Sequence, residues 1–232
     1  MNRLPEGTIP SPNIWDFTTA YEIENAAVDP DGVIEAAVAE VRGWAGADVL
    51  DVGCGTGYHL PRFAATARTV TGVEPHPRLA RLAVRRTALL GNVTIRQGTA
   101  QALPLPDGSV DLAHARWAYF FGPGAEPGLA ELARVCRRGG AAVVLDHDAT
   151  RSAVGRWFAA ALPAYDPAAV DAFWARHGFA RRRLDVRWVF ADRSDLAAVL
   201  RIEFGPAVAD RALAEHPGLE VDAAMNLWHR TY

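Results

Sequence analysis

The middle of the chain alternates short apolar runs with amphipathic segments. Apolar runs predict strands, and segments whose apolar residues recur every three or four positions predict helices. Such strand and helix alternation is typical of βαβ units, in which right-handed crossovers build a parallel sheet covered on both faces. The pattern predicts helices at 32–44, 58–67, 78–90 and 127–136, and strands at 48–51, 69–73, 93–97, 110–115 and 141–146.

The two ends of the chain are less regular than its middle. Residues 1–30 are interrupted by Pro5, Pro10 and Pro12, so we expect a leader that folds over the rest as a lid. We expect one domain over 31–232, with variable helical insertions at about 150–180 and 194–217. After residue 146 the pattern predicts helices at 153–161, 167–177, 195–203 (capped by Ser194 or Asp195) and 206–216, and strands at 184–190 and 223–229.

Composition excludes several classes of protein. The chain has 232 residues, of which 50% are hydrophobic, so it can bury a sizeable core and is neither disordered nor fibrous. All 24 basic residues are arginines, which leaves no lysine for a Schiff base, and a net charge of -3 gives no general affinity for nucleic acid. Cys54 and Cys136 occupy positions unsuited to a structural disulfide. With no signal peptide core or long apolar run, we expect a cytoplasmic protein without membrane contact.

A glycine-rich turn follows the first predicted strand. Residues 51–57 read Asp-Val-Gly-Cys-Gly-Thr-Gly, and a second apolar run ends at Glu74. Alternate glycines let a ligand approach the main chain closely, which is typical of adenosine-binding turns. The spacing Gly-x-Gly-x-Gly differs from the Gly-x-Gly-x-x-Gly of dinucleotide enzymes.

This turn and its acid resemble motif I and the second-strand acid of class I S-adenosylmethionine-dependent methyltransferases, of the small-molecule Methyltransferase-11-like or UbiE-like type. Residues 97–111, 131–140 and 177–179 are similar to later landmarks of the same family, in the same order. The resemblance implies an α/β fold with a doubly wound, Rossmann-like sheet of seven strands, helices on both faces and the last strand antiparallel beside strand five. It also implies S-adenosylmethionine as cofactor and S-adenosylhomocysteine as product.

Candidate cofactor residues fall at the carboxyl ends of the predicted strands, where ligands of doubly wound sheets bind. Glu74 can accept both ribose hydroxyls. Thr99 stands where family members often carry an aspartate for the adenine amino group, and the alternative is that it only caps its loop. The candidates are Tyr21, Asp51, Gly53, Cys54, Gly55, Gly57, Glu74, Pro75, Thr99, Ala100, Gln101, Arg116 and Trp117.

The methyl acceptor has a weaker signal. His147, between Asp146 and Asp148, is a candidate general base oriented by a neighbouring acid, and the alternative is a simple chain turn. The same three residues could ligate a metal, but Arg116 stands where a further oxygen ligand is needed, so we predict none. His59 and His114 suit structural or cofactor-shell roles. Aromatic candidates for the acceptor pocket gather at 15–21, 117–121 and 157–174.

The sequence therefore predicts methyl transfer to oxygen, nitrogen or carbon of a small organic molecule, such as an aromatic or secondary metabolite. Two alternatives stay open: a non-catalytic module that binds the cofactor for regulation or assembly, and a methyltransferase of tRNA or protein. The expected partner is the small-molecule acceptor, with no nucleic acid and no membrane. A monomer and a homodimer are equally compatible with the sequence.

Overall fold

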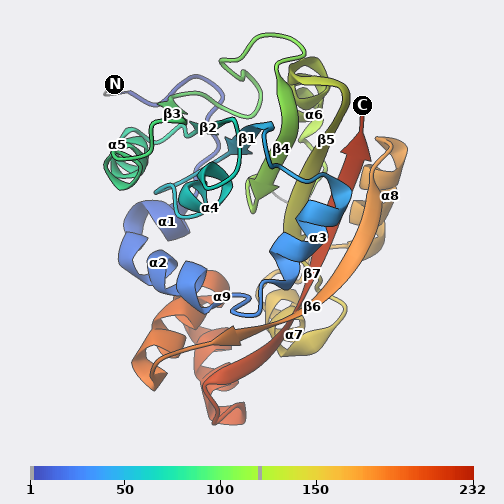
Figure 1. The fold of residues 1–232 in the computed structure, drawn as a ribbon. Coiled ribbons are helices and arrows are strands. Elements are labelled where there is room, and N and C mark those ends of the chain that lie inside the picture. Colours follow the sequence, from blue (N-terminus) through green and yellow to red (C-terminus); the bar gives the residue numbers. More distant parts are fainter. Residues whose placement is uncertain (1–2, 120–121) are drawn as a thin grey trace.

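A single seven-stranded sheet runs through the molecule (Figure 1). The computed structural model describes residues 3–119 and 122–232. The strand order is β3-β2-β1-β4-β5-β7-β6; β1 to β5 pair in parallel, and β7 is antiparallel to both β5 and β6. The predicted fold is confirmed, including the last strand beside strand five. The strands are β1 Asp48–Val52, β2 Thr69–Val73, β3 Val93–Arg96, β4 Val110–Arg116, β5 Cys136–His147, β6 Ala180–Val189 and β7 Glu220–Thr231.

Two hydrophobic clusters cover opposite faces of the sheet. Neighbouring strand residues alternate between them, with Leu112 and Val143 in one cluster and Ala113 and Val144 in the other. This alternation is the signature of a sheet buried on both faces. The covering helices are α3 Val33–Val41, α4 Leu60–Ala64, α5 Pro77–Arg86, α6 Glu126–Val135, α7 Ser152–Ala161, α8 Pro167–Arg176 and α9 Arg193–Glu215. None of the helices in the described ranges is long and apolar enough to cross a membrane.

The leader is helical, which the sequence analysis did not predict. It forms α1 Pro12–Asp16 and α2 Thr18–Ala27, with Pro12 at the first helical position, where its missing N–H costs nothing. Arg78 of α5 donates to the Trp15 carbonyl at 2.8 Å, and Ile14 is buried. In Figure 1 the leader lies beside α4, α5 and α9, and α2 contacts α9 directly. The leader is therefore part of the folded body.

The two helices predicted at 195–203 and 206–216 form one kinked helix, α9, and its cap differs from the predicted one. Gly205, with a φ of 73°, interrupts α9 between the two helices predicted there. Asp192 caps α9 by accepting a hydrogen bond from the Asp195 amide at 2.9 Å. The predicted cap at Ser194 or Asp195 is wrong because both residues are already inside the helix, while Asp192 keeps the extended backbone of a cap.

Three strands are longer than the sequence pattern indicates by more than one residue. β5 starts at Cys136 instead of 141, so this cysteine lies in a strand and not on a helix face. β6 starts at Ala180 and includes the three arginines 181–183, whose long side chains hide the strand periodicity. β7 extends beyond the predicted 223–229 at both ends, because its pairing continues with β6 as far as Glu220 and with β5 as far as Thr231.

The packing of α9 gives a test of stability. Leu200 on α9 is 0% exposed, whereas Leu89 is 97% exposed. We expect Leu200→Ala to lower the free energy of unfolding by about 2 to 5 kcal/mol, because it removes buried methyl groups and leaves a cavity. Urea unfolding measures the loss. The matched change Leu89→Ala should alter stability by less than about 0.5 kcal/mol, and equal losses in the two variants would contradict this account of the core.

Candidate functional site

The glycine-rich turn leaves β1 through a backbone that only glycine adopts easily. Gly53 has a φ of 71° and donates its amide to the Val73 carbonyl at 2.8 Å. A β-carbon at this position would lie 2.8 Å from the β-carbon of Ala118, which cannot move away as a flexible side chain could. The turn is thus fixed between the end of β2 and the exit of β4.

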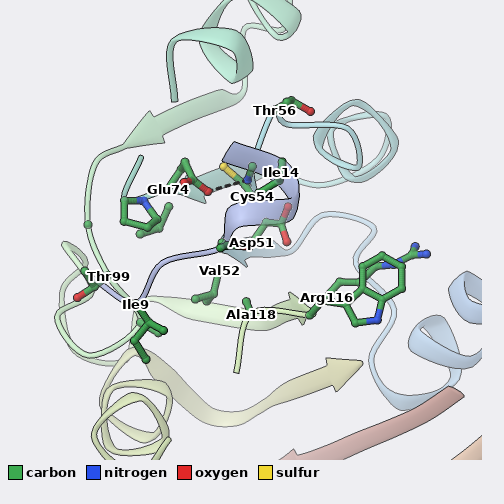
Figure 2. A pocket seen from close by; sticks show the side chains of 18 of the residues that line it. Ile9, Ile14, Asp51, Val52, Cys54, Thr56, Glu74, Thr99, Arg116 and Ala118 are labelled. Atoms are coloured by element: carbon green, nitrogen blue, oxygen red, sulfur yellow. Dashed lines mark hydrogen bonds between the residues drawn. The ribbon is translucent and has the colours of Figure 1, made fainter. Parts of the chain in front are cut away.

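A first cavity opens at this edge of the sheet, above the glycine turn (Figure 2). Of the thirteen predicted cofactor residues, all but Gly57 line it. Gly57 instead gives room for α5, because a β-carbon there would lie 3.0 Å from the β-carbon of Ala83. Several other lining residues, most of them in the leader, were not predicted from the sequence: Thr8, Ile9, Ser11, Ile14, Asn25 and Thr56. His59, considered for a structural or cofactor-shell role, also lines the cavity.

Glu74 is the acid at the end of β2, and its carboxylate faces the cavity. It is 4% exposed, and its two oxygens accept hydrogen bonds from the amides of Gly55 at 2.9 Å and His76 at 2.8 Å (Figure 2). Burial raises the pKa of Glu74 to about 7, although both amide hydrogen bonds act in the opposite direction. Two amides therefore fix the orientation of a carboxylate that still has free lone pairs toward the cavity.

Asp51 and His114 form a buried pair beneath the turn. They lie opposite each other on β1 and β4, and Asp51 Oδ1 is 2.7 Å from His114 Nδ1. His114 thus orients Asp51, which lines the cavity, although His114 itself does not line it. This position agrees with the cofactor-shell role considered for His114.

Arg116, the last residue of β4, and Trp117, which follows it, lie at the far side of the cavity. Arg116 has two nitrogens, Nε and Nη2, that are buried without a hydrogen-bond partner among the described residues, and its Nη1 is 3.4 Å from His59 Nε2. A guanidinium so placed is a ready partner for an anionic group of a ligand. Trp117 has a φ of 52°, an uncommon conformation for a bulky residue, and it turns its ring toward Tyr21, 6.4 Å away between ring centroids.

A second cavity of about 220 Å³ adjoins the first, and Ser11, Tyr21 and Trp117 line both. His147, at the end of β5, lies in its wall and stacks on Trp117, with 5.2 Å between ring centroids. Burial and the nearby Arg116 lower the pKa of His147 to about 3. Neither ring nitrogen has a hydrogen-bond partner in the described part of the chain. His147 is therefore an uncharged imidazole in the second cavity, with one ring nitrogen free to accept a hydrogen bond.

The acids that flank His147 point elsewhere. Asp146 accepts hydrogen bonds from Asn226 and Trp228, each at 3.0 Å. Asp148 accepts a hydrogen bond from the Thr150 hydroxyl and forms an ion pair with Arg183 at 3.2 Å. The expectation that one of them orients His147 is wrong: neither ring nitrogen of His147 has a partner among the described residues, and Asp146, its neighbour on β5, points to the opposite side because successive residues of a strand do so. The side chains that do approach His147 are Glu24 and Glu203, which the sequence analysis missed, and their oxygens and a ring nitrogen lie within 4.8 Å of one another.

The predicted aromatic segments divide between pocket and core. Trp15 and Tyr21 line the first cavity, and Tyr119, Phe158 and Trp174 line the second. Trp157 and Phe173 are buried in the two hydrophobic clusters instead. Phe120 and Phe121 lie outside the described residues.

Comparison with known proteins confirms the resemblance to methyltransferases. Residues 50–144 match a family described as Methyltransferase domain. The chain is 37% identical over 105 residues to a phosphatidylethanolamine N-methyltransferase of Cereibacter sphaeroides, covering 44% of this chain and 51% of that protein. It is 34% identical over 114 residues to a demethylmenaquinone methyltransferase of Tropheryma whipplei, covering 49% of this chain and 47% of that protein. The chain thus spans about half the length of the curated relatives it matches.

A solved structure extends the likeness to most of the fold. A SAM-dependent methyltransferase from Aquifex aeolicus superposes with a TM-score of 0.57 at 16% identity, over 90% of this chain and 97% of that one. At this identity the likeness shows the fold alone.

The raised pKa of Glu74 predicts a pH-dependent stability difference. The folded state disfavours the charged carboxylate, so this group's stabilisation is present at low pH and is lost as pH rises from its usual value of 4.5 through about 7. Glu74→Gln removes this loss. Between pH 5 and pH 8, the unfolding free energy of the variant should gain about 2 kcal/mol relative to the natural protein.

Urea unfolding at both pH values measures this shift. Comparing the two proteins at each pH cancels the titration of all other groups, as well as any pH-independent cost of the amide. A difference between the two proteins that is the same at pH 5 and pH 8 would contradict the raised pKa.

Proposed function

We propose that this chain, which carries a methyltransferase domain over residues 50–144, transfers the methyl group of S-adenosylmethionine to a small organic acceptor. The observation that carries the proposal is a pair of adjoining cavities that share the side chains of Tyr21 and Trp117. The first has the turn and the acid expected for an adenosine cofactor. The second is lined by aromatic residues and His147. A methyl donor in the first cavity and a methyl acceptor in the second would meet at the wall that the two cavities share.

The first cavity suits the cofactor in shape and in charge. The absent β-carbon of Gly53 leaves room for close approach to the main chain, and Glu74 presents a carboxylate for the ribose hydroxyls. In this proposal Thr99, Ala100 and Gln101 surround the adenine. The unpartnered nitrogens of Arg116 suit the carboxylate of the methionine part. When bound, the cofactor supplies a methyl group made electrophilic by its sulfonium.

The chain's own contribution to the reaction is positioning and exclusion of water. Methyl transfer is an in-line displacement that consumes charge, so holding the nucleophile close and dry accelerates it. Ile14 of α1 and Tyr21 of α2 lie over the first cavity, and the second is bounded by Phe158 and Trp174. Covered cavities of this kind favour a free small molecule over a folded macromolecule.

His147 contacts the acceptor in this proposal. Its low pKa leaves the ring uncharged at neutral pH, so it can accept a hydrogen bond from the acceptor's O–H or N–H. Its stacking on Trp117 places it next to the shared wall. His147 therefore orients the nucleophile toward the methyl group.

Replacing Glu74 tests the cofactor site. Glu74→Ala should weaken binding of S-adenosylmethionine and S-adenosylhomocysteine at least tenfold, because charge-assisted hydrogen bonds worth about 1.5 to 3 kcal/mol are lost. Isothermal titration calorimetry measures both affinities. Glu126→Ala, at an exposed glutamate of α6 that lines neither cavity, serves as the control. Unchanged affinity in Glu74→Ala would refute the ribose assignment.

Replacing His147 separates acceptor from cofactor. His147→Ala should lower kcat/KM for the acceptor at least tenfold while the affinity for S-adenosylhomocysteine stays within about twofold, since the histidine lines only the second cavity. Release of S-adenosylhomocysteine gives the rate, and His229→Ala, on β7 outside both cavities, is the control. A normal rate in His147→Ala would contradict this role of His147, because the other walls of the second cavity would then position the acceptor.

A further inference from the structure

Three polar side chains from distant parts of the chain meet at the edge of the second cavity, which His147 and Glu203 line and beside which Glu24 lies. Glu24 comes from α2, His147 from β5 and Glu203 from α9, and one ligand atom of each lies within 4.8 Å of the other two. Glu24 is 0% exposed and His147 is 2% exposed. Glu203 is partly exposed and accepts a hydrogen bond from the Asn13 amide at 2.8 Å.

This cluster has more acceptors than donors. Among the described residues, no amide, hydroxyl or guanidinium donor reaches either oxygen of Glu24 or either ring nitrogen of His147. Burial raises the pKa of both glutamates, and the two carboxyls face each other, so they are able to share one proton. Arg116 acts on Glu24 only at longer range and forms no ion pair within the described ranges. Buried acceptors without donors are costly, and a ligand that donates would relieve them.

Aromatic rings complete the walls around the cluster. Tyr21, Trp117, Tyr119, Phe158 and Trp174 line the same cavity. Aromatic faces attract cations, with Trp the strongest. Carboxylates at one end and aromatic rings around them form a pocket for an organic ammonium group.

We propose that the methyl acceptor is a primary or secondary amine whose ammonium group lies between Glu24, Glu203 and His147. This inference rests on the proposed function and narrows its acceptor class. Acceptors about 2.8 Å from one tetrahedral nitrogen are separated from each other by about 4.6 Å, which is inside the 4.8 Å within which the ligand atoms of the cluster lie.

The cluster also supplies the proton balance of the reaction. The ammonium first gives a proton to the carboxyl pair, which frees the nitrogen lone pair. That lone pair then forms the new N–C bond as the C–S bond breaks, and the bonding electrons go to sulfur. The donor becomes the neutral thioether, and the positive charge leaves on the methylated ammonium.

A divalent metal ion is the other cation that this cluster could hold. The cavity of about 220 Å³ is far larger than the ~10–15 Å³ that a single water requires. Its remaining walls are mainly aromatic and aliphatic, with Ser11, Asn13 and Asp146 as the polar exceptions, whereas divalent metals such as magnesium and calcium are surrounded by oxygen ligands. Volume and lining therefore favour an organic amine.

Paired probes of equal shape test the inference. Phenethylamine and its neutral counterpart 2-phenylethanol are titrated calorimetrically into the full chain saturated with S-adenosylhomocysteine. We expect phenethylamine to bind at least tenfold more tightly than 2-phenylethanol. Glu203→Gln should reduce this preference to less than threefold, and Glu24→Gln provides a second, isosteric variant. Glu215→Gln, at an exposed glutamate of the same helix, should retain the preference.

The other outcomes would contradict either the amine assignment or the proposed function. Equal binding of the two probes, binding of neither, or a preference that persists in both variants would overturn the amine assignment. Loss of phenethylamine binding after EDTA treatment would also overturn it, because the cluster would then hold a metal ion. Failure of S-adenosylhomocysteine to bind would contradict the proposed function itself, whereas normal binding without amine preference would contradict only the acceptor class.

Discussion

The turn after β1 passes so close to the exit of β4 that no side chain fits between them at Gly53. A β-carbon there would meet Ala118 at 2.8 Å, and the positive φ of Gly53 carries the chain away from β1 before the contact occurs. This close approach determines where both cavities form. The turn forms the floor of the first cavity. Trp117 and Arg116, which precede Ala118 at the end of β4, form its far wall. Trp117, held with a φ of 52°, then separates the first cavity from the second.

The leader depends on the same turn for its position. Arg86 of α5 donates to Thr56 Oγ1 at 2.8 Å and pairs with Glu22 of α2, so one guanidinium joins the helix, the turn and the leader. Exposed ion pairs contribute little energy individually, and the burial of Ile14 and Ala27 supplies more. The result is a cover that brings Tyr21 to the shared wall and Glu24 to the acidic cluster. Cofactor and acceptor chemistry are thus coupled through one short segment.

The lining of the first cavity was predictable from the sequence where its residues are contiguous in the chain. The glycine turn, Glu74 and the 99–101 loop each follow a strand whose apolar run is easy to recognise, and parallel strands bring such ends to one edge of the sheet. Gly57 does not line the cavity, and its spacing alone cannot distinguish contact with a ligand from packing on a helix. Glu24 and Glu203 could not be found, since they lie on helices outside the βαβ pattern and meet only after α2 contacts α9. Both carboxylates lie on helix faces that packing buries, and these faces can be recognised only once the positions of the helices are known.

Binding of S-adenosylmethionine to the intact chain and to Gly53→Ala tests the central claim most directly. The account predicts one bound molecule per natural chain by calorimetry. It predicts no measurable binding by Gly53→Ala protein whose circular dichroism spectrum shows it folded, because the new β-carbon displaces the turn from Ala118. Absence of binding by the natural protein, or full binding by the folded variant, would contradict it.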